Sequence, residues 1–354
     1  MYTIPEVSFE EVSGRDGNLG LITLTRPQVL NALNHAMFLA MYNQLSEWQA
    51  ANQIKAVVIR AADGRAFCAG GDIRYTYDRK MANDETLPIF FRDEYRLNQL
   101  IHHYTKPYIA LLDGITMGGG VGISIHASHR LATDRLIFSM PETSIGFYPD
   151  VGTTYVLSRL PHKMGYFIGL TGVRLNHQDC FAVGIVDELV QQNKFPEIIF
   201  ALADESFATD AKASVTKVLQ KFSMLPSDSV WWERRAIIEK CFAKKTMEDI
   251  IHALEKEKET WCHDIATDLK NKSPTSLKVT LRALQEAEKM DFDECMQTEF
   301  RLTCHFLESK EFFEGIRAAI IDKDRAPKWH PAKLTDVSTP YVKKFFAPLE
   351  REFV

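Results

Sequence analysis

The sequence of 354 residues lacks three features: an apolar run long enough to cross a bilayer, a paired-cysteine motif and an excess of basic charge. A transmembrane helix needs about 20 consecutive apolar residues, so we expect no membrane partner. The net charge of −5 argues against binding to nucleic acid, although it leaves room for a local basic patch that faces an anionic small molecule. Internal repeats and low-complexity tracts are absent as well.

The cysteines and the N-terminal residues bear on the compartment. Six cysteines are scattered along the chain without a CxxC pair, at positions 68, 180, 241, 262, 295 and 304, which is typical of free thiols in a reducing environment. The first 25 residues contain Glu6, Glu10, Glu11 and Asp16. These acids suit neither the apolar centre of a signal peptide nor an acid-poor transit sequence. We therefore expect a cytoplasmic protein.

Strands and helices alternate through about residue 190, which predicts a layered α/β core. Helical patterns without strands follow from about residue 200. Residues 1–200 are thus expected to form an α/β core that carries the functional site, and residues 201–354 a helical C-terminal region with an extended terminal arm from Asp324. The expected strands cover 19–26, 54–60, 108–113 and 136–140, and the expected helices cover 38–48, 123–127, 211–222, 230–243, 247–269 and 275–289. Ser273 followed by Pro274 is typical of a helix start.

Two glycine-rich stretches could place backbone amides close to a ligand, AFCAGGDIR at residues 66–74 and ITMGGGVG at 115–122. Together they could offer two N–H donors to one oxygen, as an oxyanion hole does. Tight turns with close helix packing would explain the same glycines equally well. A nucleotide-binding GxGxxG motif is excluded because Ile123 stands where its last glycine would be, and no GK[ST] exists for a P-loop.

The stretch MPETSIGFYPDVG, residues 140–152, carries two acids among apolar and turn-forming residues. Glu142 in such a setting is a candidate general base or nucleophile. Asp150 fits the same chemistry, although an N-cap role for the following helix explains it as well. Glu94, in FFRDEYR, has the charge spacing of a solvated helix face. His126 and His129 have HxxH spacing without a third ligand, so we expect no metal site.

The chain resembles the crotonase (enoyl-CoA hydratase/isomerase) superfamily and, within it, the 3-hydroxyisobutyryl-CoA hydrolases. The stretches that carry the resemblance run nearly end to end: RPQVLNALN, AFCAGGDIR, FFRDEYRLN, KPYIALLDGITMGGGVGIS, MPETSIGFYPDVG, LTGVRL, KSPTSLKVTLR and FFEGIRAAIIDKDRAPKW. The resemblance implies a crotonase-like spiral of ββα units with a helical C-terminal region.

The resemblance also implies roles for individual residues. Gly71 and Gly119 would donate their amides to the thioester carbonyl of an acyl-CoA, and Glu94, Glu142 and Asp150 would line the acyl end. Typical hydratases carry a first catalytic glutamate at the position of Gly122, so this sequence departs from their pattern.

The implied activity is hydrolysis of a short 3-hydroxyacyl-CoA, 3-hydroxyisobutyryl-CoA above all, as in valine catabolism. The alternatives are an enoyl-CoA hydratase or isomerase of the same fold and a non-catalytic acyl-CoA-binding protein. Arg74 could meet a CoA phosphate, although an exposed surface arginine explains it equally well. CoA is then part of the substrate, and no separate cofactor is expected. Relatives often form trimers or hexamers, so a homo-oligomer is possible.

Overall fold

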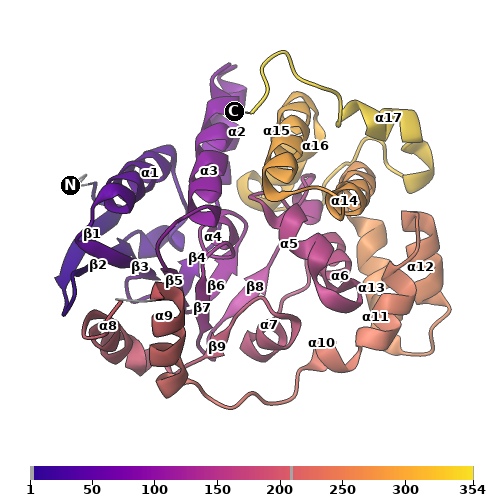
Figure 1. Cartoon of the computed structure of the whole chain (residues 1–354). Helices are drawn as coiled ribbons and strands as arrows, with labels where there is room; N and C mark the ends of the chain where they lie inside the picture. The colour runs from indigo at the N-terminus through magenta and orange to yellow at the C-terminus, as the bar shows by residue number, and fades with distance from the viewer. Residues whose placement is uncertain (1–3, 208–209, 354) are drawn as a thin grey trace. The chain divides into compact units, whose positions relative to one another are not determined.

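The computed structural model describes residues 4–207 and 210–353 and contains both helices and sheets (Figure 1). The chain forms two compact units, each drawn from several segments. The first unit comprises Met1–Gly71, Arg96–Phe138 and Arg174–Trp232. The second unit comprises Asp72–Tyr95, Ser139–Val173 and Glu233–Val354. The two units therefore do not follow the single boundary near residue 200 that the change in composition suggests.

A six-stranded sheet organises the first unit, with strand order β1-β2-β3-β5-β7-β9. β1 pairs antiparallel with β2, and the other neighbours are parallel. The strands are β1 (Val7–Ser13), β2 (Asn18–Leu24), β3 (Ile54–Ala61), β5 (Tyr108–Leu112), β7 (His129–Ala132) and β9 (Glu188–Leu189). The near-continuous apolar runs of β2, β3 and β5 are what a parallel sheet covered on both faces requires.

Helices cover both faces of this sheet. Alternate residues of β2, β3 and β5 pack with α8 (Phe195–Ala203) and α9 (Ala211–Leu219) in one buried cluster. On β2, Gly20 faces α1 (His35–Ala50) instead, because a Cβ there would lie 2.5 Å from the Trp48 ring. The first unit also contains α7 (His177–Val183). The strands β2, β3 and β5 and the helix α1 confirm the elements expected from the sequence.

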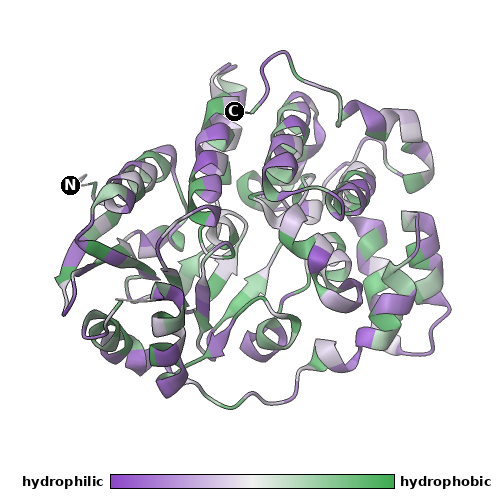
Figure 2. Cartoon of the chain, viewed as in Figure 1, coloured by the Kyte–Doolittle hydropathy of each residue, from purple (hydrophilic) through white to green (hydrophobic). Residues whose placement is uncertain are grey.

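A three-stranded sheet carries the two glycine stretches. Its order is β4 (Ala66–Cys68), β6 (Ile115–Met117) and β8 (Ile137–Ser139). β4 and β6 run parallel, with Cys68 opposite Thr116. In Figure 2, β8 is drawn mostly as hydrophobic. The carboxyl ends of parallel neighbours lie at the same edge of a sheet, so the segments after β4 and β6 emerge side by side.

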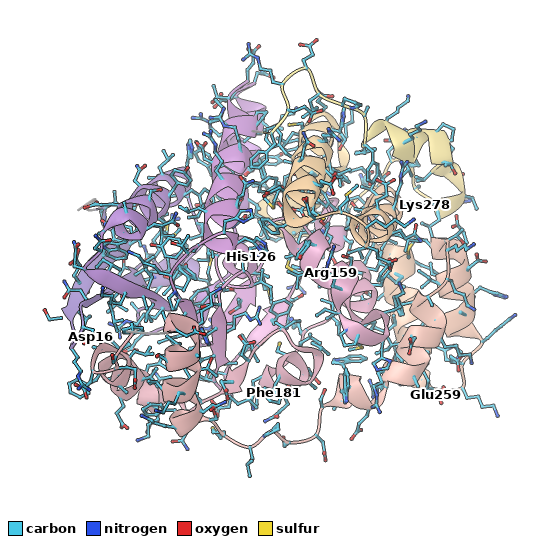
Figure 3. All side chains as sticks on the ribbon, in the orientation of Figure 1. Asp16, His126, Arg159, Phe181, Glu259 and Lys278 are labelled. Carbon is cyan, nitrogen blue, oxygen red and sulfur yellow. The ribbon has the colours of Figure 1, made fainter. Side chains whose placement is uncertain are left out.

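The second unit is helical. Ser273 caps α14 through its side chain and Pro274 is the first helical residue, which confirms the expected start. Arg159 at the end of α5 donates to the carbonyls of Ala287 at 3.0 Å and Met290 at 2.5 Å, where Figure 3 labels it beside α14. The helices are α2 (Ile73–Met81), α5 (Thr153–Arg159), α6 (Met164–Thr171), α11 (Arg235–Phe242), α12 (Met247–Glu255), α13 (Thr260–Asn271), α14 (Pro274–Ala287), α15 (Phe292–Glu308), α16 (Glu311–Ile316) and α17 (Thr339–Lys344). α3 (Leu87–His102) and α10 (Val230–Glu233) contribute residues to both units.

Two glycines allow backbones to touch behind the turn that carries Glu142. That turn is the short 3-10 helix η2 (Glu142–Ile145), which ends at Gly146. A Cβ on Gly146 would lie 2.2 Å from the Glu311 carbonyl oxygen, and a Cβ on Gly315 would lie 2.0 Å from the Ile145 carbonyl oxygen. The turn and α16 can therefore approach this closely only because both positions lack a side chain.

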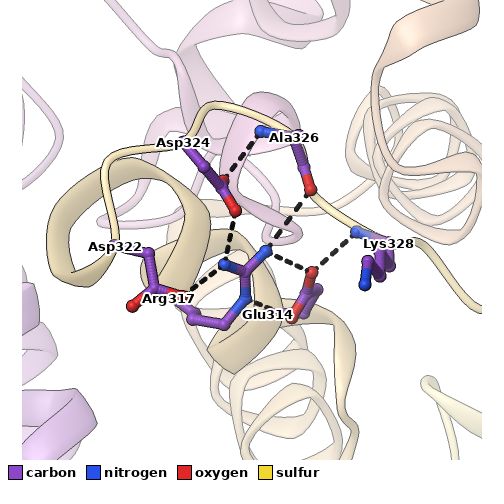
Figure 4. Close-up of polar contacts among 6 residues, drawn as sticks. All are labelled: Glu314, Arg317, Asp322, Asp324, Ala326 and Lys328. Atoms are coloured by element: carbon purple, nitrogen blue, oxygen red, sulfur yellow. Dashed lines mark hydrogen bonds and ion pairs between the residues drawn. The ribbon is translucent and has the colours of Figure 1, made fainter.

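Arg317 fastens the segment that follows α16 (Figure 4). Its guanidinium donates to Glu314 at 2.8 and 2.9 Å, to Asp322 at 2.6 Å and to Asp324 at 2.8 Å. Glu314 also accepts from the Lys328 amide at 2.7 Å. One planar cation thus holds three carboxylates and fixes residues 322–328 against the helix.

Some expectations for secondary structure are wrong. The helices expected at 230–243 and 247–269 are each two helices, α10 with α11 and α12 with α13. The helix expected at 123–127 lies earlier, as the single turn α4 (Gly119–Gly122), and residues 123–127 form turns. The terminal arm is not wholly extended, since it contains a 3-10 turn, η7 (Leu334–Asp336), and α17. Within residues 4–207 and 210–353, no helix has both the length and the apolar character to span a membrane.

Candidate active site

The two glycine loops of the first unit come close together after β4 and β6. Gly70 has φ +118°, and a Cβ there would lie 3.7 Å from the Gly119 amide nitrogen. The loop after β4 is anchored because the Leu33 amide donates to Gly70 at 2.9 Å and the Ala69 amide donates to Leu30 at 3.0 Å. A side chain at Gly70 would be strained and would crowd the neighbouring loop.

Gly120 sets how closely α4 packs on β4. A Cβ on Gly120 would lie 2.2 Å from the Cys68 carbonyl oxygen, far inside van der Waals contact. In the part of the chain that the structure describes, no acceptor is recorded for the amide nitrogen of Gly71 or of Gly119. Unpaired amides held by packed backbone are the chemistry of an oxyanion hole.

Three acids gather in the second unit and are almost completely buried. The exposed fraction is 3% for Glu94, 6% for Glu142 and 5% for Asp150. Oε2 of Glu142 is buried and has no hydrogen-bond partner among the described residues. A buried carboxylate oxygen without a donor is unfavourable in the free protein, so its place in this cluster calls for a functional explanation.

Hydroxyl groups of two tyrosines and a threonine hold Asp150. The Tyr95 hydroxyl donates to Oδ2 of Asp150 at 2.7 Å and lies 2.6 Å from the Thr303 hydroxyl. The Tyr148 hydroxyl lies 2.8 Å from the same threonine and donates to the backbone carbonyl of Glu299. This network fixes one oxygen of Asp150 and leaves the other outside it.

Burial raises the pKa of all three acids, and a neighbouring acid raises it further for two of them. Burial raises the pKa of Glu94 and of Glu142 well above the usual range, and the nearby Asp150 charge raises both further. Burial raises the pKa of Asp150 to about 7, although the hydrogen bond from Tyr95 acts in the opposite direction. The three carboxyl groups therefore do not all carry charge at neutral pH.

Lys272 is the cation of this cluster. Its side chain is 6% exposed, donates to the Ser144 hydroxyl at 2.6 Å and pairs with Asp268 at 3.1 Å. Burial lowers the pKa of Lys272, while Asp268 and Glu142 raise it. The positive charge in turn lowers the pKa of Glu142, and so favours the ionised carboxylate that a nucleophile or base needs.

Two of the alternatives from the sequence are wrong. Glu94 is not a solvated helix charge, because the face of α3 that carries it is buried. Asp150 is not a side-chain N-cap: α5 begins after Gly152 without a capping side chain, and the Asp150 carboxylate instead accepts from Tyr95. Arg74 is exposed and donates to the Ile320 carbonyl at 3.0 Å.

Sequence reasoning misses the residues that surround the acids. Tyr95, Tyr148 and Lys272 lie inside stretches that carry the family resemblance, yet the sequence pattern gives them no role. Glu299 and Thr303 are spaced by four residues in α15, which places both on one helix face. A glutamate on the apolar face of a helix is the signal that could have found Glu299.

The chain belongs to the enoyl-CoA hydratase/isomerase family, whose model matches residues 19–346. A solved carnitinyl-CoA dehydratase from Mycobacterium thermoresistibile is 36% identical with a TM-score of 0.90, and the match covers 99% of this chain and 98% of that one. A solved enoyl-CoA hydratase from Rhodobacter sphaeroides 2.4.1 is 35% identical with a TM-score of 0.86, and covers 96% and 97%. The expected crotonase fold with C-terminal helices is confirmed.

Curated relatives of high similarity carry a more specific name. The mitochondrial 3-hydroxyisobutyryl-CoA hydrolase of Danio rerio is 41% identical over 98% of this chain and 90% of that protein. The Homo sapiens protein of the same name is 40% identical over 95% and 88%. These names confirm the resemblance to that hydrolase family. They also make the expected cytoplasmic location wrong, because the relatives are named as mitochondrial.

Gly120→Ala should destabilise the protein, because the new methyl group meets the Cys68 backbone carbonyl rather than a movable side chain. We expect a loss of about 1–3 kcal/mol in the free energy of unfolding, measured by urea denaturation. Gly64→Ala is the control, since its Cβ would make ordinary contact at 3.5 Å. Equal stability of the two variants would contradict the packing argument.

Asp150→Asn should flatten the pH dependence of stability. Because the folded-state pKa is raised from 3.8 to about 7, the folded protein holds this proton more tightly than the unfolded chain. Its contribution to stability is therefore complete at low pH and is lost as pH rises from about 4 to 7. Unfolding free energies at pH 4 and pH 8 should differ less in Asp150→Asn than in the wild type. The exposed Asp336→Asn should keep the wild-type difference; an unchanged difference in Asp150→Asn would contradict the assignment.

Proposed function

We propose that this protein hydrolyses 3-hydroxyisobutyryl-CoA to 3-hydroxyisobutyrate and free CoA, a step of valine breakdown. Two near-full-length relatives at about 40% identity bear the name of that activity. The structural observation that carries the proposal is the buried, unpartnered oxygen of Glu142 beside Asp150 and Lys272. Thioester hydrolysis needs a nucleophile or a general base at the carbonyl carbon, and a carboxylate can serve as either.

In the proposed reaction, the amides of Gly71 and Gly119 stabilise the negative charge that develops on the thioester oxygen. Loss of one such donor typically costs about 2.7 to 4 kcal/mol of transition-state stabilisation. Glu142 either attacks the carbonyl carbon or takes a proton from the attacking water. The carbon–sulfur bond then breaks, and the CoA thiolate leaves and is protonated.

Other residues have supporting roles in the proposed reaction. Lys272 favours the ionised state of Glu142. Asp150, held by Tyr95, orients the water or the 3-hydroxyl of the substrate with its other oxygen. Glu94 lines the acyl end of the substrate. Arg74, which is exposed, is the proposed contact for a CoA phosphate.

A hydratase or isomerase is the second candidate, since two solved structures of the same fold are titled a dehydratase and a hydratase. Addition of water across a double bond uses two proton-handling groups in the typical hydratases that this sequence resembles. In this chain, Gly122 stands at the position of the first of these two groups and has no side chain to transfer a proton. A non-catalytic acyl-CoA binder is disfavoured because three buried acids would only weaken binding of an anionic ligand.

Thiol release from a panel of short acyl-CoA esters tests the proposal. Release should be fastest with 3-hydroxyisobutyryl-CoA, with 3-hydroxypropionyl-CoA as the nearest competitor, because one methyl group is worth about 1–3 kcal/mol of discrimination. Crotonyl-CoA should lose its enoyl absorbance more slowly than the preferred ester releases thiol. Enoyl turnover that exceeds thiol release would overturn the hydrolase assignment.

Glu142→Gln should lower kcat by at least about 1,000-fold while leaving the affinity for the CoA ester within about threefold, because the amide is neither a nucleophile nor a base. Steady-state kinetics and equilibrium binding of the ester measure the two effects. Glu85→Gln, the same chemical change at an exposed position, is the control for altered net charge. A near-normal rate in Glu142→Gln would remove Glu142 from the mechanism.

Single turnover in oxygen-18 water separates the two routes. Attack by Glu142 forms an anhydride, and its hydrolysis can leave label in the Glu142 carboxylate. General-base hydrolysis places label only in the product. Mass spectrometry of the peptide that contains Glu142 distinguishes these outcomes.

A further inference from the structure

Glu299 is a buried acid to which the proposed mechanism gives no role. It lies on α15, its exposed fraction is 0%, and three donors satisfy its carboxylate. Oε2 accepts from the Gly152 amide at 2.6 Å, and Oε1 accepts from the Thr154 amide at 3.0 Å and the Thr154 hydroxyl at 2.6 Å. All three donors come from the residues directly after Asp150.

The backbone between Asp150 and α5 needs such support. Val151 has φ +55° and Gly152 has φ +78°, so two successive residues adopt the left-handed region. A β-branched residue rarely does so, at a cost of order 1–3 kcal/mol. The amides of Gly152 and Thr154 converge on the Glu299 carboxyl group, which accepts from both. The aspartate at the start of the turn is thereby fixed in position.

The helix α15 is also linked to the Asp150 side chain through hydrogen-bonded hydroxyl groups. Thr303, one turn after Glu299, contacts the hydroxyls of Tyr95 and Tyr148, and Tyr95 donates to the Asp150 carboxylate. The Tyr148 hydroxyl in turn donates to the Glu299 carbonyl. Figure 1 shows α15 beside α5, the helix that begins after this turn. One face of α15 thus holds both the backbone that follows Asp150 and the hydroxyl that binds its side chain.

We propose that Glu299 is a positioning residue: its carboxylate holds the turn at residues 151–154 and so aims Asp150 for thioester hydrolysis. The inference rests on the proposed function, in which Asp150 orients water or the substrate hydroxyl. Glu299 acts through Asp150 and does not touch the substrate.

The hydrogen bond from Tyr95 to Asp150 gives the role a signature that a merely structural contact lacks. Burial raises the pKa of Glu299 to about 8, the donors from Thr154 and Gly152 lower it, and the Asp150 charge raises it. Because Glu299 titrates above Asp150, it acts on Asp150 through geometry rather than through charge. The bond from Tyr95 lowers the pKa of Asp150, and a turn that Glu299 no longer holds should weaken this bond, so the pKa of Asp150 should rise. The amide of a glutamine would direct an N–H at a backbone N–H and lose one of the three hydrogen bonds.

Glu299→Gln therefore tests the proposal. We expect kcat for 3-hydroxyisobutyryl-CoA to fall about 10- to 100-fold with KM within about threefold, and the acid limb of the kcat profile to move to higher pH by about half a unit or more. A carbon-13 carboxyl titration by NMR, with the Asp150 resonance assigned from Asp150→Asn, should show the same upward shift of the Asp150 pKa without any substrate.

Two variants serve as controls. Thr298→Val removes the neighbouring buried hydroxyl of α15, which donates to Glu294 at 2.9 Å and not to the turn; kcat and the pH profile should stay at wild-type values. Thr154→Val removes the 2.6 Å hydroxyl donor to Glu299 together with a hydrogen bond to Cys295, and kcat should fall about threefold or more with KM unchanged. This variant carries the test if Glu299→Gln does not fold.

The outcomes separate the two proposals. Wild-type kcat and pH profile in Glu299→Gln, or a fall in kcat that matches a fall in folded protein while the Asp150 titration is unchanged, would overturn the positioning role. So would wild-type kcat in Thr154→Val where Glu299→Gln fails to fold. If the wild type itself releases no thiol, the proposed function fails, and the NMR titration alone then decides whether Glu299 acts on Asp150.

Discussion

The desolvation of carboxyl groups is the constraint on which the second unit depends. Taking an unpaired charge out of water costs several kcal/mol, and like charges in a buried group add to that cost. Here Glu94, Glu142 and Asp150 are buried together. Hydroxyl donors and one ammonium group reduce this desolvation free energy, and some of the acids retain their protons and so remain uncharged. The only buried carboxylate oxygen left without a donor is on Glu142, within the part of the chain that the structure describes.

This constraint explains why the C-terminal helices belong to the functional part of the molecule. Lys272 lies between α13 and α14, and Glu299 and Thr303 lie on α15. Lys272 contributes a positive charge, Thr303 a hydroxyl, and Glu299 the hydrogen bonds that hold the turn after Asp150. The sequence suggests a helical appendage after residue 200, but the compact units of the structure combine the acids at 94, 142 and 150 with these later helices.

The fold alone does not define the reaction, because proteins named as dehydratase, hydratase and hydrolase share it. The glycine loops suit any reaction in which negative charge develops on an acyl oxygen. The side chains around the acyl carbon decide which bonds then form and break, and the absence of a side chain at Gly122 is as informative as the presence of Glu142. Function is thus determined by a few positions on a common framework.

Much of the fold can be predicted from the sequence, because buried parallel strands such as β3 and β5 are continuous apolar runs and Ser273-Pro274 is a strong local signal. The helix α4 cannot be predicted from the sequence because its glycines have low intrinsic helix propensity. Its close packing on Cys68 becomes visible only in the structure. Glu94 resembles a solvated residue because charge spacing within one helix does not reveal what packs against it. Glu299 gives no signal of its partners because they lie 145 and 147 positions away in the chain. The expected compartment is wrong because acidic residues near the N-terminus carry less information than the relatives do.

The contact between Gly146 and α16 has a consequence for how this chain can change over time. Since a methyl group at either Gly146 or Gly315 would collide with main-chain atoms of the opposite segment, no compensating side-chain substitution can relieve the clash. The two positions are therefore locked to the smallest residue as a pair. A sequence change that shifts the turn bearing Glu142 is therefore tolerated only if the backbone of α16 shifts with it.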